Sequence, residues 1–243
     1  MNCIDESDSI ILLPFRVAIL GSMGSGKSNF IFNFILNIQK VTDIKKYGDN
    51  VEIIFCYSSP NSLYSMEQAA KETGILFTPC KLLPDLTKIT EYQKSDNKRQ
   101  LLIFFEDLQF NFSKLSLQQK KDFNTFILQS RHQNISTLIT YHSFPYGSHN
   151  NELTSNYLKN ATVIVIFQFL NDKRSMNLFA NNLLGKDYSE MFKHFFEESV
   201  KLSSLDKSKP YVLIDTDTRK NISMSHRMRI DIFHRNLILN NDI

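Results

Sequence analysis

A glycine-rich segment near the amino terminus has the residue types of a phosphate-binding loop. It reads Gly21-x-x-x-x-Gly26-Lys27-Ser28, which is the spacing of a Walker A motif. Glycines allow backbone angles that turn consecutive N–H groups toward phosphate oxygens, and the helix that follows adds partial positive charge. We expect ATP as the ligand, with Lys27 at its β- and γ-phosphates and Ser28 as a ligand of Mg²⁺. The expected nucleotide-contacting residues are Gly21, Ser22, Met23, Gly24, Ser25, Gly26, Lys27, Ser28 and Asn29.

An acidic pair, Glu106 and Asp107, follows the uninterrupted apolar run LLIFF at 101–105. This is the layout of a Walker B motif, in which a strand carries carboxylates to the edge of the sheet where the phosphate loop lies. Because successive strand residues point to opposite faces, the two acids should have different roles. We assign Glu106 to the magnesium shell and Asp107 to the attacking water. The alternative for either acid is that it caps a helix or solvates a turn.

Two more polar residues flank the apolar run at 136–141. Arg131, in the segment SRHQN, precedes this run, and His142 follows it. The planar, permanently charged guanidinium of Arg131 could reach the ATP of a neighbouring subunit, or it could be a solvated group at a helix end. His142 could donate to the γ-phosphate or to the attacking water, or it could be a half-buried structural histidine. Both residues are candidate catalytic residues, and the sequence leaves both alternatives open.

The elements that must position these residues alternate along the chain. Apolar runs at 15–20, 51–57, 101–105, 136–141 and 162–167 predict strands, and a further strand is expected at 211–214. Helices are expected from Lys27, over 63–72 before Gly74, from Ser116, and twice between 173 and 199. This alternation is typical of a parallel sheet covered by helices on both faces. The sequence therefore predicts an α/β fold with a mostly parallel five-stranded core sheet and β additions at its carboxyl-terminal end.

The size and charge of the chain limit its organisation and partners. Its 243 residues suffice for one α/β domain, so we expect a single domain over 1–243, with an amino-terminal extension at 1–13 and a strand and basic tail from about 200. The net charge is only +3, so any contact with nucleic acid needs a local patch or several subunits. The basic residues of the tail could touch DNA or a neighbour, although a solvated face is the simpler reading; they are Arg219, Lys220, His226, Arg227, Arg229 and Arg235.

The cysteines and apolar runs bear on the cellular setting. The three cysteines are scattered without a C-x-x-C pair, which suggests neither a zinc knuckle nor a disulfide framework and fits a reducing, intracellular setting. The first residues carry acids where a signal peptide would carry Lys or Arg. The apolar runs are much shorter than the ~20 residues of a membrane helix, so we expect a soluble protein without a membrane partner.

Taken in order, the motifs resemble a known family. The segments PFRVAILGSMGSGKS, FCYSSPNS, LLIFFEDL, SRHQNISTLITYHSF and YVLID are similar to those of the poxvirus-type genome-packaging ATPases of the FtsK/HerA superfamily, which has relatives in virophages and Polinton-like elements. The resemblance covers about 14–215. Arg131 matches the family's arginine before strand four, whereas His142 stands where the family commonly has glutamine. The Glu-Asp order at 106 and 107 also departs from the usual acids.

The resemblance implies a RecA-like ASCE P-loop NTPase that assembles as a homo-oligomeric ring. Such a motor uses ATP and Mg²⁺ to drive double-stranded DNA into a preformed capsid, whose proteins would be further partners. It would work inside a host cell, in the cytoplasm or at a viral assembly site, or in association with the virion. Two other functions fit a Walker A motif. A nucleoside or nucleotide kinase would need a lid with several arginines, of which only Arg174 stands near the expected place, and a nucleotide-dependent switch has less need of Asp107.

Overall fold

An eight-stranded, mostly parallel sheet forms the centre of the computed structural model, which describes residues 11–96, 98–107, 114–142, 152–167, 173–206, 209–220, 228–229 and 232. The strand order is β3-β2-β4-β5-β1-β6-β7-β8. The strands are β1 (Arg16–Leu20), β2 (Val51–Tyr57), β3 (Leu76–Lys81), β4 (Gln100–Glu106), β5 (Ile135–Tyr141), β6 (Val163–Phe167), β7 (Tyr211–Asp215) and β8 (Met228–Arg229). Strands β1 to β6 pair in parallel, and β7 and β8 are added in antiparallel fashion.

The sheet confirms the five predicted core strands and the predicted β additions, but it contains one parallel strand more than predicted. A sixth parallel strand, β3, lies at the edge beside β2. Its sequence, LFTPCK, hides this because Pro79 lies in its middle and most of its residues are exposed. Proline removes a ladder donor and therefore argues against a central strand, although an edge strand tolerates it.

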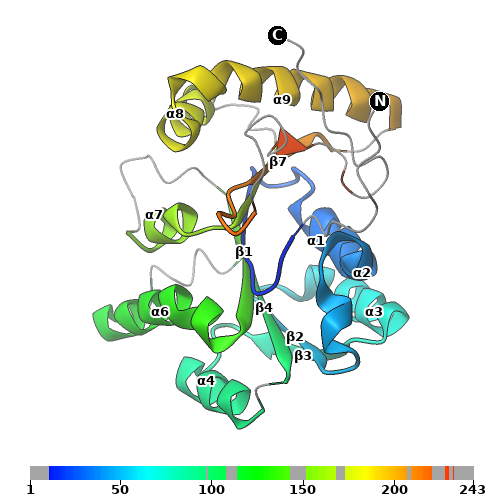
Figure 1. The fold of residues 1–243 in the computed structure, drawn as a ribbon, viewed down its shortest axis with the longest axis vertical. Coiled ribbons are helices and arrows are strands. Elements are labelled where there is room, and N and C mark those ends of the chain that lie inside the picture. Colours follow the sequence, from blue (N-terminus) through cyan, green and yellow to red (C-terminus); the bar gives the residue numbers. More distant parts are fainter. Residues whose placement is uncertain are drawn as a thin grey trace.

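Helices cover both faces of the sheet (Figure 1). On one face lie α1 (Lys27–Leu36), α2 (Ile38–Val41) and α3 (Leu63–Thr73), and on the other α4 (Leu86–Ser95), α6 (Leu117–Gln129) and α7 (Glu152–Lys159). Helices α8 (Lys173–Leu184) and α9 (Lys186–Asp206) lie across one end. The described residues also form three short 3₁₀ turns: η1 (Ile44–Tyr47), η2 (Pro60–Ser62) and η3 (Ser130–Gln133).

Alternation along the strands divides the core into two layers. In β4, Phe105 packs in the layer under α4 and α6, and Phe104 packs in the layer under α1 and α3. Since strand side chains alternate between faces, a strand covered on both sides reads as an unbroken apolar run. The predicted helix signals also hold: Ser116 and Gln119 form a capping box at the start of α6, and Gly74 ends α3 in the left-handed conformation.

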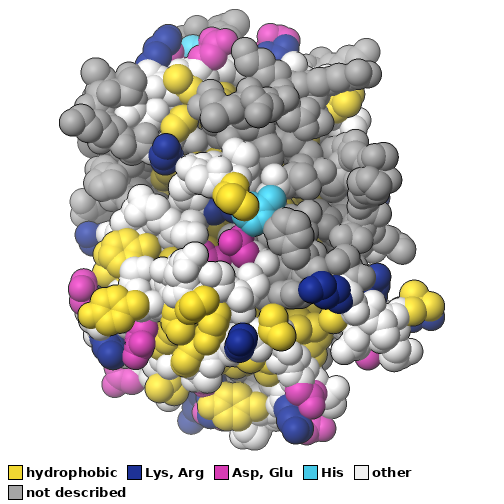
Figure 2. All heavy atoms as spheres, turned by 180° about the vertical axis from the view of Figure 1, so that it is seen from behind, with side chains coloured by type: hydrophobic (Ala, Val, Ile, Leu, Met, Phe, Trp, Pro, Cys, Tyr) yellow, Lys and Arg dark blue, Asp and Glu magenta, His cyan; other side chains and the backbone are white. Residues whose placement is uncertain are grey.

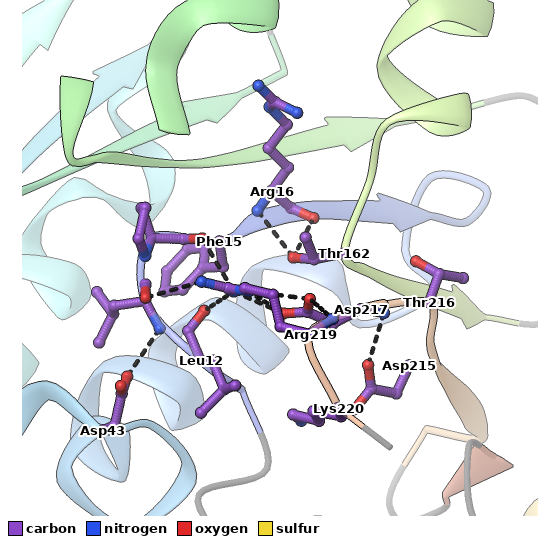
Figure 3. Close-up of polar contacts among 12 residues, drawn as sticks. Leu12, Phe15, Arg16, Asp43, Thr162, Asp215, Thr216, Asp217, Arg219 and Lys220 are labelled. Atoms are coloured by element: carbon purple, nitrogen blue, oxygen red, sulfur yellow. Dashed lines mark hydrogen bonds and ion pairs between the residues drawn. The ribbon is translucent and has the colours of Figure 1, made fainter. Parts of the chain in front are cut away.

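The segment before β1 is held against the edge of the sheet where the parallel strands begin. Ile11 is 1% exposed and Leu13 is buried, so the end of the predicted extension packs into the core. The guanidinium of Arg219 donates to the carbonyl oxygens of Leu12, Leu13 and Pro14 and pairs with Asp217 (Figure 3). Arginine has five donors in a fixed fork, which suits it to bind several carbonyls at once.

Three residues of the predicted basic tail, Arg219, Lys220 and Arg229, lie within the described part of the chain. Arg219 binds the segment before β1, Lys220 pairs with the buried Asp215, and Arg229 is itself buried in β8. Lys220 and Arg229 are therefore not part of a solvated face, whereas Arg219 is exposed but bound to the carbonyls before β1. The other tail residues, His226, Arg227 and Arg235, lie outside the described residues. Among the described helices, none combines the length and the apolar character that crossing a bilayer requires.

Candidate functional site

The glycine-rich loop connects the central strand β1 to α1, and its shape depends on two glycines. Gly26 caps α1 with φ 106°, a left-handed value that a residue with a Cβ adopts at a cost. A Cβ on Gly26 would also lie 2.9 Å from the side chain of Lys209. At Gly21 a Cβ would lie 2.4 Å from the Ser25 hydroxyl and 2.8 Å from the Cβ of Phe167. The loop is therefore packed tightly against its surroundings at both ends.

One cavity of about 340 Å³ is lined by the loop after β1 and by residues at the carboxyl ends of β2, β4 and β5. The lining residues are Met23, Gly24, Gly26, Lys27, Ser28, Asn29, Ser59, Asn61, Ser62, Glu106, Asp107 and His142. The loop follows β1, the acidic pair ends β4, and His142 follows β5; because these strands are parallel, their carboxyl ends meet at one edge. Figure 2 shows acidic, basic and histidine side chains meeting near the centre of one face of the molecule.

Glu106 is the buried acid of the cavity, with 3% of its surface exposed. The hydroxyls of Ser62 and Ser28 both hydrogen-bond to its carboxylate. Burial raises the pKa of Glu106, and these two hydrogen bonds oppose that rise. Its other oxygen, Oε1, is buried and has no hydrogen-bond partner among the described residues. A buried carboxylate oxygen of this kind is a strong acceptor for a cation or a water molecule.

Asp107 lines the same cavity, although adjacent strand residues should point to opposite faces. Its φ of 54° shows why: the residue has left the extended conformation, so strand alternation no longer applies to it. The two side chains therefore do not point to opposite faces as predicted, although the two acids still differ in burial. The backbone N–H of Asp107 donates to the Thr140 hydroxyl at 3.0 Å, which fixes this turn against β5.

A chain of hydrogen bonds joins Asp107, His142 and Lys27. The Asp107 carboxylate lies 2.7 Å from His142 Nε2, and His142 Nδ1 lies 3.1 Å from Lys27 Nζ. Since an ammonium group can only donate and a carboxylate can only accept, the neutral imidazole must carry its proton on Nε2. The hydrogen bond from His142 is the main reason why the pKa of Asp107 lies below its usual value. Asp107 is therefore ionised at neutral pH.

Lys27 lies folded back over the loop. Its ammonium donates to the carbonyl oxygens of Gly21 at 2.7 Å and Ser22 at 3.0 Å. Burial lowers the pKa of Lys27, and the charges of Asp107 and Glu106 oppose that effect. The ammonium group of Lys27 is thus held beside the loop by the carbonyl oxygens of Gly21 and Ser22 and by the nearby charges of Asp107 and Glu106.

The structure does not bring Arg131 to this cavity. Arg131 lies in η3, before the start of β5, and therefore at the opposite edge of the sheet from the loop. Its pKa is lowered by burial and by the nearby charge of Arg219. A role toward the ATP of a neighbouring subunit stays a prediction, and a role in the cavity of its own chain does not fit this position.

Sequence reasoning missed the residues that follow β2. Ser59, Asn61 and Ser62 line the cavity from the turn that contains η2, and the Ser62 hydroxyl holds Glu106. The available signal was the polar run SSPNS at the end of a strand. Its use required knowing that β2 is the neighbour of β4, where Tyr57 pairs with Glu106.

Comparisons with known proteins add little to these observations. No protein-family model matches the chain, and no curated protein matches it. Among solved structures, the cytoplasmic domain of EssC is similar at 14% sequence identity with a TM-score of 0.48. The match covers 68% of this chain and 33% of that chain, so this protein spans about a third of that structure. The functional interpretation therefore depends on the residues of the cavity.

Proposed function

We propose that this protein binds ATP with Mg²⁺ in the cavity beside Gly21–Ser28 and hydrolyses it. One observation carries the proposal: a glycine-rich loop with a lysine and a serine lines the same cavity as two carboxylates. Nucleotide hydrolysis needs a cradle for the phosphates, a shell for the metal and an acceptor that orients water. Residues Gly21–Ser28 would bind the phosphates, Ser28 and Glu106 would hold the metal, and Asp107 would orient the water.

The donor set of the cavity fits Mg²⁺, a hard cation that prefers oxygen ligands. The Ser28 hydroxyl and the Glu106 carboxylate are already in contact, and Glu106 Oε1 is buried without a partner in the described part of the chain. The Ser25 hydroxyl of the loop is likewise buried and unpartnered there. Bound Mg²⁺ would neutralise charge on the β- and γ-phosphates. Ser28 would hold it directly, and Glu106 would hold it directly or through its water shell.

The protein's own residues account for the remaining steps. Lys27 would leave the carbonyls of Gly21 and Ser22 and donate to the phosphates, which are stronger acceptors because they are charged. Asp107, which is ionised, would accept a hydrogen bond from the attacking water and orient it. His142, which donates to Asp107 from Nε2, would fix the carboxylate and lies near enough to stabilise charge that develops during hydrolysis.

We further propose that hydrolysis drives double-stranded DNA through a homo-oligomeric ring of RecA-like subunits, as in a genome-packaging motor. The support is the ordered set of motifs that resembles the packaging ATPases, together with a strand order in which β1, the strand before the loop, lies beside β5 and one strand away from β4. In such a ring, Arg131 of one subunit would act on the ATP of the next. Arginine supplied by a neighbour is worth about 10³ to 10⁵ in rate in GTPase systems.

The decisive experiment is the ATPase rate per subunit as a function of protein concentration, with and without double-stranded DNA. We expect the rate to rise with concentration and with DNA, and to vanish in Lys27→Ala. A rate that stays flat in both titrations would overturn the motor while leaving the ATPase standing. Transfer of phosphate to a nucleoside would identify a kinase, and ATP binding without turnover would identify a switch.

A further inference from the structure

Two cysteines that are far apart in the sequence lie side by side on neighbouring strands. Cys56 in β2 is the register partner of Cys80 in β3, and paired residues of neighbouring strands direct their side chains to the same face. The two thiols lie close enough for an interaction between them to shift the pKa of both. Cys56 is 0% exposed within the core layer, whereas Cys80 packs against that layer from the edge and is only partly buried.

The surroundings make the two thiols chemically unequal. The interaction with Cys56 lowers the pKa of Cys80 to about 7, although partial burial opposes this effect. The same interaction, together with burial, raises the pKa of Cys56 well above its usual value. Since the thiolate is the nucleophile, the reactive sulfur of the pair belongs to the residue that solvent can reach. The buried thiol retains its proton and faces the reactive one.

The backbone geometry permits a bond between the two sulfurs. Neighbouring strands lie about 4.8 Å apart, within the Cα separations of about 4.4 to 6.8 Å that disulfides allow. Bond formation also needs the Cβ atoms to approach to about 3.8 Å, closer than strand pairing alone gives. Strand β3 can make this small movement because it is an edge strand with β2 as its neighbour in the described sheet.

We propose that Cys56 and Cys80 form a redox site that hydroperoxides oxidise to an intramolecular disulfide. The Cys80 thiolate attacks the peroxide oxygen and breaks the O–O bond, which gives a sulfenic acid and releases hydroxide or alkoxide. The Cys56 thiol then attacks the sulfenic sulfur, and its proton leaves with the hydroxyl group as water. The two sulfurs lose two electrons in total, and the peroxide gains them. Dithiols reverse the reaction by thiol–disulfide exchange.

This site is separate from the nucleotide cavity, so its test does not depend on ATP hydrolysis. The reduced full-length chain is treated with hydrogen peroxide at neutral pH, and its peptides are mapped by mass spectrometry without reduction. We expect a cross-linked pair of peptides that carry Cys56 and Cys80, lighter by two hydrogens than the separate peptides and released by dithiothreitol. Overoxidation of Cys80 to a sulfinic acid without a cross-link would overturn the proposal. Cross-links that all include Cys3, with none between Cys56 and Cys80, would also overturn it.

Matched variants identify the order of events. Cys3→Ser should keep the cross-link, because the proposed site consists of Cys56 and Cys80. Cys80→Ser should lose it. In Cys56→Ser, the sulfenic acid on Cys80 should persist and be captured by dimedone, since the second thiol is missing. Dimedone labelling of Cys56 in Cys80→Ser at an equal rate would show that Cys80 is not the reactive thiol.

Discussion

We expect that replacement of Asp107 by Asn separates ATP binding from ATP turnover. The amide oxygen of Asn can still accept the hydrogen bond from His142 Nε2, now made at 2.7 Å, so the side chain should keep its position. The amide cannot accept a proton and carries no charge toward the attacking water. Loss of a positioned base typically lowers the rate by about 10²- to 10⁴-fold. We expect turnover to fall by that factor while the dissociation constant for ATP changes by no more than a few-fold.

The variant should also be nearly as stable as the wild type at neutral pH. The pKa of Asp107 is lowered in the folded state, so its ionised form contributes stability above the unfolded pKa of about 4, and this contribution is lost as the pH falls through the folded pKa. The carboxylate is 40% exposed, which limits the contribution to less than about 1 kcal/mol. Thermal unfolding at pH 7 and pH 3 measures both the size and the sign of this effect.

The control is Asp122→Asn on the surface of α6, where the exposed carboxylate accepts a hydrogen bond from Gln118 that an amide can also accept. It should leave turnover and ATP affinity unchanged. Turnover of Asp107→Asn that matches this control would refute the catalytic role of the carboxylate. A loss of ATP affinity as large as the loss of turnover would instead assign Asp107 to binding.

Four further predictions follow from single contacts. Ser62→Ala removes a donor from the buried carboxylate beside it; we expect about 1 kcal/mol weaker metal binding, seen as an approximately fivefold higher Mg²⁺ requirement for hydrolysis. Gly26→Ala places a Cβ in a left-handed conformation, which should cost about 1–2 kcal/mol and lower the melting temperature by roughly 2–8 °C. Iodoacetamide labelling of Cys80 should rise with pH as the thiolate forms, with its midpoint at about 7, and a midpoint near that of a free thiol would contradict the pairing. Neither Lys27→Ala nor Arg131→Ala should hydrolyse ATP alone, but a mixture should regain activity, whereas an inactive mixture would argue against action between subunits.

Much of the fold could be predicted because its strands are covered on both faces. The run at 101–105 became β4 with every residue buried, and the helix that starts after Ser116 has the capping box that its sequence indicates. Strand β3 escaped prediction because an edge strand needs neither unbroken apolarity nor a full set of donors, so Pro79 is tolerated there. A local sequence pattern predicts strands whose side chains are buried, and it fails for a strand that is only partly buried.

The candidate site was predictable only as far as each residue could be tied to the end of a strand. Lys27, Glu106 and His142 each follow a recognisable strand, and parallel strands bring their carboxyl ends to one edge. Ser62 could not be assigned in this way, because its contact with Glu106 depends on which strands are neighbours. Strand order is set by tertiary packing across the whole sheet, and a single sequence contains no local signal for it. The same reason hid the pairing of Cys56 with Cys80.

The two edges of the sheet also constrain how subunits could cooperate. The cavity lies where β1, β4 and β5 end, and Arg131 lies before β5 begins. A seven-residue strand such as β5 spans about 23 Å at 3.3 Å per residue, much more than an arginine side chain can reach. An arginine at that edge can therefore act on ATP only in another subunit. A ring makes this contact head to tail, and a two-fold dimer makes it twice, because its symmetry pairs each arginine with the other subunit's cavity. If Arg131 is catalytic, an isolated monomer is therefore inactive, and only an assembly that brings this edge of one subunit to the cavity of another can hydrolyse ATP.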